Sequence, residues 1–193
     1  MNSLFHMQEK QIFAGNLLFI ACCGFYLAWW LLTFRTPDVV NGMKTGWLLI
    51  PASLSGLLGV VLILRSILAK TLVKQLLPSG YILWGGLIVY FILLGFTVLL
   101  LKRPATSELI LIVGWGMLAL AEINALFGSG LFSQRLSVGF LLLICVSVVI
   151  SLICYILYYR LDSRAGYIDG MIPLLLTALT MIGISCFMVF LDK

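Results

Sequence analysis

The sequence predicts an all-α fold, a polytopic transmembrane helical bundle with six spans that forms a single transmembrane domain over residues 1–193. Hydrophobic residues make up 63% of the chain and charged residues only 10%, whereas ordinary soluble domains are about half apolar and a quarter charged. The apolar residues form runs of roughly the 20 residues that cross a bilayer. A soluble fold of this size would expose more apolar surface than water tolerates, so we expect hydrocarbon to surround most side chains.

The six runs can be placed along the chain with an error of a few residues at each end. They cover approximately residues 12–34, 46–68, 80–101, 108–128, 136–159 and 168–191. Backbone groups in lipid must be hydrogen-bonded within their own segment, so each run is expected to be helical despite its glycine, β-branched and aromatic residues. The first run is too long for the apolar part of a signal peptide and ends in aromatic residues, which predicts an uncleaved span.

The connection after the second run has a helical pattern of its own. Leu64, Leu68, Leu72 and Leu76 recur every four residues, roughly opposite Ser66, Lys70 and Lys74. This pattern predicts a helix that extends into, or lies along, the membrane interface until Pro78 ends it.

The basic residues leave the orientation nearly undetermined. On the side of the N-terminus lie Lys10, Arg65, Lys70, Lys74, Arg135 and Lys193, and on the opposite side lie Arg35, Lys44, Lys102, Arg103, Arg160 and Arg164. Because the positive-inside rule counts Lys and Arg alone, it gives a tie. The density of positive charge between residues 65 and 74 favours both termini in the cytoplasm, and dual topology is the alternative.

Aromatic residues gather near the connections on the side opposite the termini. They are Trp29, Trp30, Phe34, Trp47, Tyr155, Tyr158, Tyr159 and Tyr167. Amphipathic rings settle at the headgroup level of a bilayer. An aromatic belt is therefore the favoured interpretation, and a ligand-stacking cluster is the alternative.

The chain can be divided into three helical hairpins, each with an outgoing helix, a short basic turn and a returning helix. The turns read FRTPDVVNG from Phe34, LKRPATSE from Leu101 and RLDSRAGYIDG from Arg160. The first two place a proline soon after a basic residue, and the third lacks the proline. Proline cannot continue a helix and a basic residue complements the negative end of the helix dipole, so this similarity has a mechanical origin even without common ancestry.

The middle hairpin, residues 85–130, resembles the two-helix unit of the HdeD-like acid-resistance membrane proteins. The shared features are a glycine-rich apolar helix, a turn with proline, and a second helix rich in Leu, Ile and Gly. The resemblance implies a small six-span bacterial inner-membrane protein built from such hairpins and linked to tolerance of acid. The other two hairpins depart from the pattern, Glu122 stands where a small residue is expected, and no functional residue carries over.

Glu122 is the one ionisable residue well inside an expected span, and together with Asn124 it forms the candidate intramembrane polar site. A charge near the bilayer centre costs on the order of 2.5–3.5 kcal/mol on insertion scales. One interpretation is a proton- or cation-coupled site facing the bundle interior; the structural alternatives are a side chain that reaches the headgroups and a protonated interhelical hydrogen-bond donor. Asn124 is two residues away and therefore on a different helix face. The polar partners that other spans offer are Asn16, Ser53, Ser55, Ser147, Ser151, Thr177 and Thr180.

Small residues spaced four apart predict close contacts between helices. The pairs are Gly24 and Ala28, Ala52 and Gly56, Ser55 and Gly59, Ala121 and Ala125, and Ser147 and Ser151. Pro51 and Pro173 lie near the starts of the second and sixth runs, where we interpret them as tolerated first-turn prolines rather than helix breaks.

The sequence carries no recognisable catalytic, cofactor-binding or metal-binding motif. The five cysteines lie inside apolar runs without a C-x-x-C pair, and the single histidine is near the N-terminus. Asp162 and Asp169, interleaved with Arg160 and Arg164, are expected to form a solvated, salt-bridged turn. The net charge of +5 is spread singly along the chain, which argues against nucleic-acid binding.

We therefore expect a non-enzymatic multi-pass protein of a cell membrane, plasma or bacterial inner, that acts in membrane stress or through interactions. The lipid bilayer is its expected partner, with homo-oligomers as a further one, no cofactor, and any small-molecule substrate left open. The alternative is a small proton- or cation-linked transporter or channel that uses Glu122. A transporter predicts a polar mid-membrane cavity that includes Glu122, whereas an interaction protein predicts a tightly packed bundle with Glu122 capped by one hydrogen bond.

Overall fold

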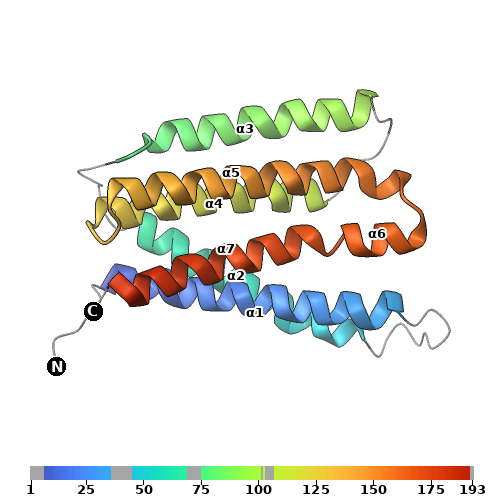
Figure 1. Ribbon diagram of the computed structural model, residues 1–193, viewed down its shortest axis with the longest axis horizontal. Coiled ribbons are helices and arrows are strands. Elements are labelled where there is room, and N and C mark those ends of the chain that lie inside the picture. The colour runs from blue at the N-terminus through green and yellow to red at the C-terminus, as the bar shows by residue number, and fades with distance from the viewer. Residues whose placement is uncertain (1–6, 36–44, 69–74, 101, 103–106, 192–193) are drawn as a thin grey trace.

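The computed structural model describes residues 7–35, 45–68, 75–100, 102 and 107–191, and this part of the chain is helical, without strands (Figure 1). The helices are α1 (Met7–Arg35), α2 (Leu49–Leu68), α3 (Ser79–Gly95), α4 (Ser107–Gly128), α5 (Gln134–Leu157), α6 (Ser163–Asp169) and α7 (Ile172–Leu191). A 3₁₀ turn, Gly46–Leu48, leads into α2, a π-helical turn, Phe96–Leu100, ends α3, and a 3₁₀ turn, Tyr158–Arg160, follows α5. Six helical segments are long and apolar enough to cross a membrane, so the predicted all-α, six-span architecture is confirmed.

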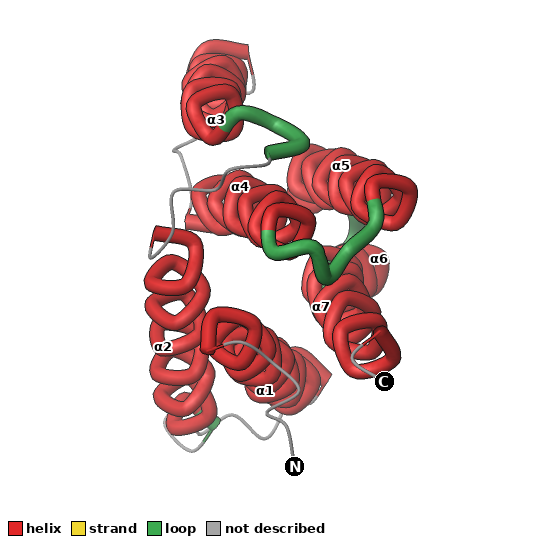
Figure 2. Tube along the Cα trace, turned by 90° about the vertical axis from the view of Figure 1, so that its left-hand side faces the viewer, coloured by secondary structure: helices red, strands yellow, loops and turns green. Residues whose placement is uncertain are grey.

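Five of the spans form a ring and the sixth lies outside it. Contacts run from α1 to α2, from α2 to α4, from α4 to α5, from α5 to α7, and from α7 back to α1. Helix α3 packs against α4 and stands apart from the ring (Figures 1 and 2). Helix α4 touches α2, α3 and α5, which makes it the most buried of the spans.

The closely packed core lies in the half of the bundle nearer the two chain ends. Its fully buried side chains come from α4, α5 and α7 and include Ile123, Leu126, Ile144, Met181 and Ile184. Dispersion contacts, rather than release of water, hold helices together inside hydrocarbon, so this density supplies much of the association energy. The opposite half is less completely filled, as described below.

The outer surface is apolar on every side of the bundle. Leu57 of α2, Phe91 and Ile92 of α3, and Leu142 of α5 are each more than 60% exposed. An exposed surface of this kind would make a protein aggregate in water, whereas lipid chains solvate it. The structure therefore supports a multi-pass integral membrane protein.

Helices α1 and α2 approach each other through glycines. A Cβ atom added to Gly59 would lie 3.0 Å from the carbonyl oxygen of Gly15, and one added to Gly56 would lie 3.0 Å from the sulfur of Cys22. The small-residue pattern thus located this contact correctly on α2. It was wrong for Gly24, which has open space around the position of a Cβ atom.

Two expectations about the connections need correction. The sixth span was expected over residues 168–191, but it begins at Ser163 and is interrupted between α6 and α7 at residues 170–171. The interface helix after α2 was expected to reach Leu76, yet residues 75–78 are not helical, and residues 69–74 lie outside the described residues. The similarity of the three hairpins to one another stays a prediction.

Gly59→Ala should weaken the contact between α1 and α2, because the added methyl group meets a backbone oxygen that cannot move independently of its helix. We expect a loss of about 1–3 kcal/mol, the usual cost of overpacking, seen as a lower melting temperature in detergent. Gly24→Ala is the matched control and should leave the melting temperature unchanged. Equal effects of the two substitutions would contradict close packing at Gly59.

Candidate functional site

Glu122 joins α4 to α1 through one hydrogen bond. The side-chain nitrogen Nδ2 of Asn16 donates to Oε1 of Glu122 over 2.6 Å, and both residues are fully buried. Of the polar partners proposed from the sequence, Asn16 is therefore the one that meets Glu122. Two of the other proposed partners, Ser151 and Thr180, donate instead to the backbone carbonyls four residues earlier in their own helices.

The Glu122–Asn16 pair leaves two oxygen atoms without hydrogen-bond partners, Oε2 of Glu122 and Oδ1 of Asn16. An ionised carboxylate in this position would lack a compensating charge, whereas a neutral acid can pair with an amide. The tightly packed surroundings and the single hydrogen bond match the structural interpretation of Glu122.

Asn124 performs a different task from Glu122. Its side-chain oxygen Oδ1 accepts from the backbone nitrogens of Leu76 and Leu77, over 2.8 and 3.2 Å, and its Nδ2 donates to the carbonyl of Leu77 over 2.7 Å. One amide thus satisfies three backbone groups of a non-helical segment, groups that would otherwise be costly at this depth. The two residues of the candidate polar site do not converge.

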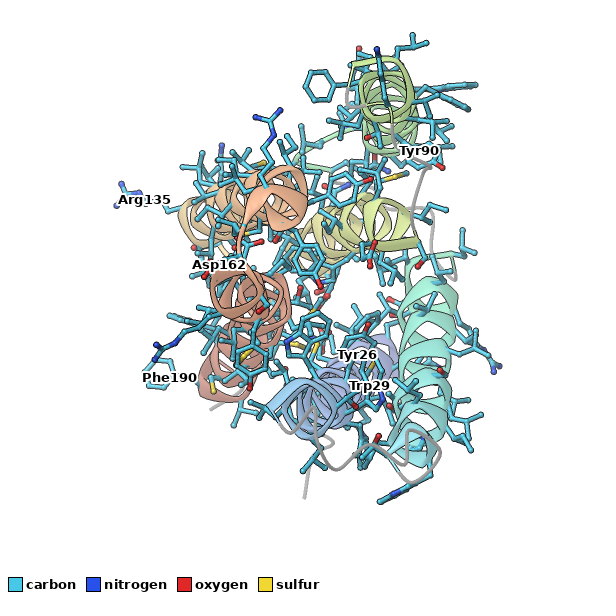
Figure 3. The ribbon with its side chains drawn as sticks, turned by 90° about the vertical axis from the view of Figure 1, so that its right-hand side faces the viewer. Tyr26, Trp29, Tyr90, Arg135, Asp162 and Phe190 are labelled. Atoms are coloured by element: carbon cyan, nitrogen blue, oxygen red, sulfur yellow. The ribbon has the colours of Figure 1, made fainter. Side chains whose placement is uncertain are left out.

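A cavity of about 240 Å³ opens in the half of the bundle away from the chain ends. Helices α1, α4, α5, α6 and α7 contribute its walls. The lining residues are Phe19, Cys22, Cys23, Tyr26, Trp30, Glu108, Leu111, Ile112, Trp115, Ser151, Cys154, Tyr155, Tyr158, Asp169, Gly170, Pro173, Leu174 and Thr177. We call it the aromatic cavity. Figure 3 looks onto this end of the bundle, where Tyr26 of α1 lines the cavity.

Trp30 fixes the wall of the aromatic cavity next to the break in the sixth span. Its indole nitrogen donates to the backbone oxygen of Tyr167 in α6 over 3.1 Å, and its ring lies 6.3 Å from that of Tyr158. A Cβ atom at Gly170 would lie 2.6 Å from the Trp30 ring. Only glycine therefore lets the indole pack this closely against the turn between α6 and α7.

Two polar groups of the aromatic cavity are buried without a hydrogen-bond partner. Asp169 is 8% exposed and its Oδ2 has none, and Trp115 is 8% exposed with a free Nε1–H. The Cys154 thiol, a weak donor, lies beside the Asp169 carboxyl group. The expected solvated salt bridge is wrong for Asp169, because none of the described basic residues pairs with it. Asp162, by contrast, is exposed and caps α6 by accepting from the nitrogen of Ala165.

The sequence contains a residue pattern that points to this cavity. The interpretation of these aromatic residues as a belt at the membrane interface overlooked it. On α1 the lining residues recur at helical spacing from Phe19 through Cys23 and Tyr26 to Trp30, and α5 with the 3₁₀ turn after it has a similar pattern from Ser151 to Tyr158. Stripes of this period mark one helix face. Trp47, at 60% exposure, suits the predicted belt, whereas Trp30 and Tyr158 turn inward.

Replacing Glu122 tests the structural interpretation. Glu122→Ala should cost about 1–3 kcal/mol, because it leaves the Asn16 amide buried and unpaired. Glu122→Gln keeps an acceptor for Asn16 and should retain the wild-type melting temperature in detergent. If Glu122→Gln proved as harmful as Glu122→Ala, the carboxyl group itself would be required.

No protein-family model, no curated protein and no solved structure matches this chain significantly. Within the described part of the chain, no three His, Cys, Asp or Glu side chains gather in an arrangement that could hold a metal ion.

Proposed function

We propose that this protein is a non-enzymatic membrane protein whose aromatic cavity binds a small amphipathic molecule taken from the lipid phase. The observation that carries the proposal is a largely apolar cavity whose lining includes Asp169 and Trp115, each of which has one buried polar atom without a hydrogen-bond partner, Oδ2 and Nε1 respectively. Apolar pockets with a few directed polar groups are the common form of small-molecule sites. Without a ligand, both buried groups lack a hydrogen-bond partner, and this costs free energy.

The dimensions of the aromatic cavity suit such a ligand. Along α1 the lining runs from Phe19 to Trp30, a rise of about 16 Å at 1.5 Å per residue, or roughly half the hydrocarbon thickness. The rim includes Glu108 and Leu111, both exposed. A molecule could therefore enter sideways from the bilayer, with its apolar body inward and its polar end near the headgroups. The volume is below the roughly 300–1,000 Å³ typical for drug-sized ligands, which favours a small molecule or one part of a longer one.

The predicted role in membrane stress or in interactions is compatible with ligand binding, and we retain it as part of the proposal. We further propose a plasma or bacterial inner membrane with both termini in the cytoplasm, based on the basic residues between positions 65 and 74. In that orientation the aromatic cavity lies in the outer half of the bilayer. Homo-oligomers remain a proposed form of assembly.

The proton- or cation-linked transporter remains a second proposal, and its support is the unpartnered Oε2 of Glu122. Glu122 does not line the aromatic cavity, so that activity would need a separate path through the bundle. We favour ligand binding because the aromatic cavity has an opening and two acidic lining residues, Glu108 and Asp169.

Filling the aromatic cavity tests the proposed function. Thr177→Trp places a large ring in the cavity, whereas Leu179→Trp, two residues away on α7, places the same ring in lipid, since Leu179 is 62% exposed. The probe is 4-phenylbutan-1-ol, and the measurement is isothermal titration with the full-length protein in detergent. We expect roughly a tenfold or greater loss of affinity in Thr177→Trp, since the ligand loses its space.

Leu179→Trp should bind 4-phenylbutan-1-ol as the wild type does. Thr177→Leu adds less volume and should give an intermediate loss. Unchanged binding in both Thr177 variants would reject the aromatic cavity as the binding site.

A further inference from the structure

We infer that the ligand of the aromatic cavity is an organic cation, with an apolar or aromatic body and a positively charged nitrogen beside Asp169. This inference rests on the proposed function and specifies its ligand class. It depends on three features of the cavity wall: a buried carboxyl group without a counter-ion, aromatic rings close to it, and a second carboxyl group at the rim.

The first feature is the isolation of Asp169. Its side chain is 92% buried and its Oδ2 lacks a hydrogen-bond partner. The neighbouring Arg160 and Arg164 are exposed, and no basic side chain in the described part of the chain forms an ion pair with Asp169. A buried carboxylate without a partner is costly, and a cation that enters the cavity would remove this cost.

The second feature is the set of rings around the same end of the cavity. Trp30 and Tyr158 form a tilted pair with centroids 6.3 Å apart, and Tyr26 and Tyr155 line the cavity with them. The faces of Trp and Tyr rings carry negative charge and attract cations, most strongly where water is excluded. Aromatic walls next to a carboxylate are the form in which proteins recognise substituted ammonium groups.

The third feature is the sign of the charge along the cavity. Its two charged lining residues, Glu108 and Asp169, are both acidic, and none of the lining residues is basic. Anionic amphiphiles such as fatty acids would be repelled from this wall, whereas cations would be drawn to the rim.

The position of the charged lining residues sets the direction in which the ligand lies. Trp115 is seven residues after Glu108 on α4, or about 10 Å deeper in the bundle, and the lining residues at that inner end are uncharged. The cationic nitrogen therefore belongs at the Asp169 end and the apolar body at the Trp115 end. This direction also leaves the charged group closest to the headgroup level.

Three probes with one body and different head groups test the inference. They are 4-phenylbutylamine, a cation at neutral pH, 4-phenylbutan-1-ol, which is neutral, and 4-phenylbutyrate, an anion. The measurement is isothermal titration with the full-length protein in detergent. We expect the amine to bind roughly ten times or more tightly than the alcohol, since close charge pairs in a desolvated site have couplings of this size or larger. The carboxylate should bind most weakly.

Substitution of Asp169 tests whether its carboxyl group causes the preference for the amine over the alcohol. In Asp169→Asn, which keeps the shape of the side chain and removes the charge, the amine should bind no better than the alcohol. Asp162→Asn is the matched control in the same loop. Asp162 is exposed and caps α6, a role that Asn also fills, so the preference for the amine should persist.

The outcomes separate the inference from the proposed function. If the alcohol binds the wild type as tightly as the amine, or if Asp162→Asn removes the preference as fully as Asp169→Asn, the cation assignment is overturned while ligand binding stands. If Asp169→Asn does not fold, the comparison of the three probes on the wild type still decides. If none of the probes binds, the proposed function fails and the cation assignment with it.

Discussion

Water is absent from the bilayer core, and the rest of the structure depends on this constraint. Backbone groups that cannot reach water must be hydrogen-bonded within the chain, so each apolar run becomes a helix. Where the backbone leaves the helical form near a span, as before α3, a side chain has to replace the missing bonds. Asn124 does so by pairing with the backbone groups of Leu76 and Leu77. Asn124, which in the sequence resembles part of a functional polar site, thus has a structural role.

The same constraint separates the two buried acidic residues. Glu122 meets Asn16 inside a closely packed interior and the pair ties α1 to α4, although each of the two residues keeps one oxygen without a partner. Asp169 also has an oxygen without a partner, Oδ2, but this residue lines a cavity. Buried polar groups in folded proteins are nearly always satisfied, so an exception in a residue that lines a cavity points to a ligand better than burial or charge alone does.

Packing is divided unevenly between the two halves of the bundle. The half near the chain ends holds the large buried side chains of α4, α5 and α7, while the other half holds the aromatic cavity. The interruption at residues 170–171 and the ring of Trp30 against Gly170 belong to this second half. The backbone stays hydrogen-bonded through this turn, since the nitrogens of Gly170 and Met171 donate to the carbonyls of Gly166 and Ile168. One half can therefore maintain the fold while the other tolerates an opening.

The sequence by itself determined the six spans, their helical form and the glycine contact on α2, because hydrophobicity over a run of residues and the demand for internal backbone bonding are local properties. It also named Asn16 among the possible partners of Glu122, while leaving open whether Glu122 faced the bundle interior or reached the headgroups. Only the tertiary structure decided that Asn16 was the partner, that Asn124 served the backbone, and that Trp30, Tyr158 and Asp169 faced a common cavity. The rotation of each helix about its axis is set by packing against its neighbours, and a helix surrounded by apolar residues carries no local signal for which face turns inward.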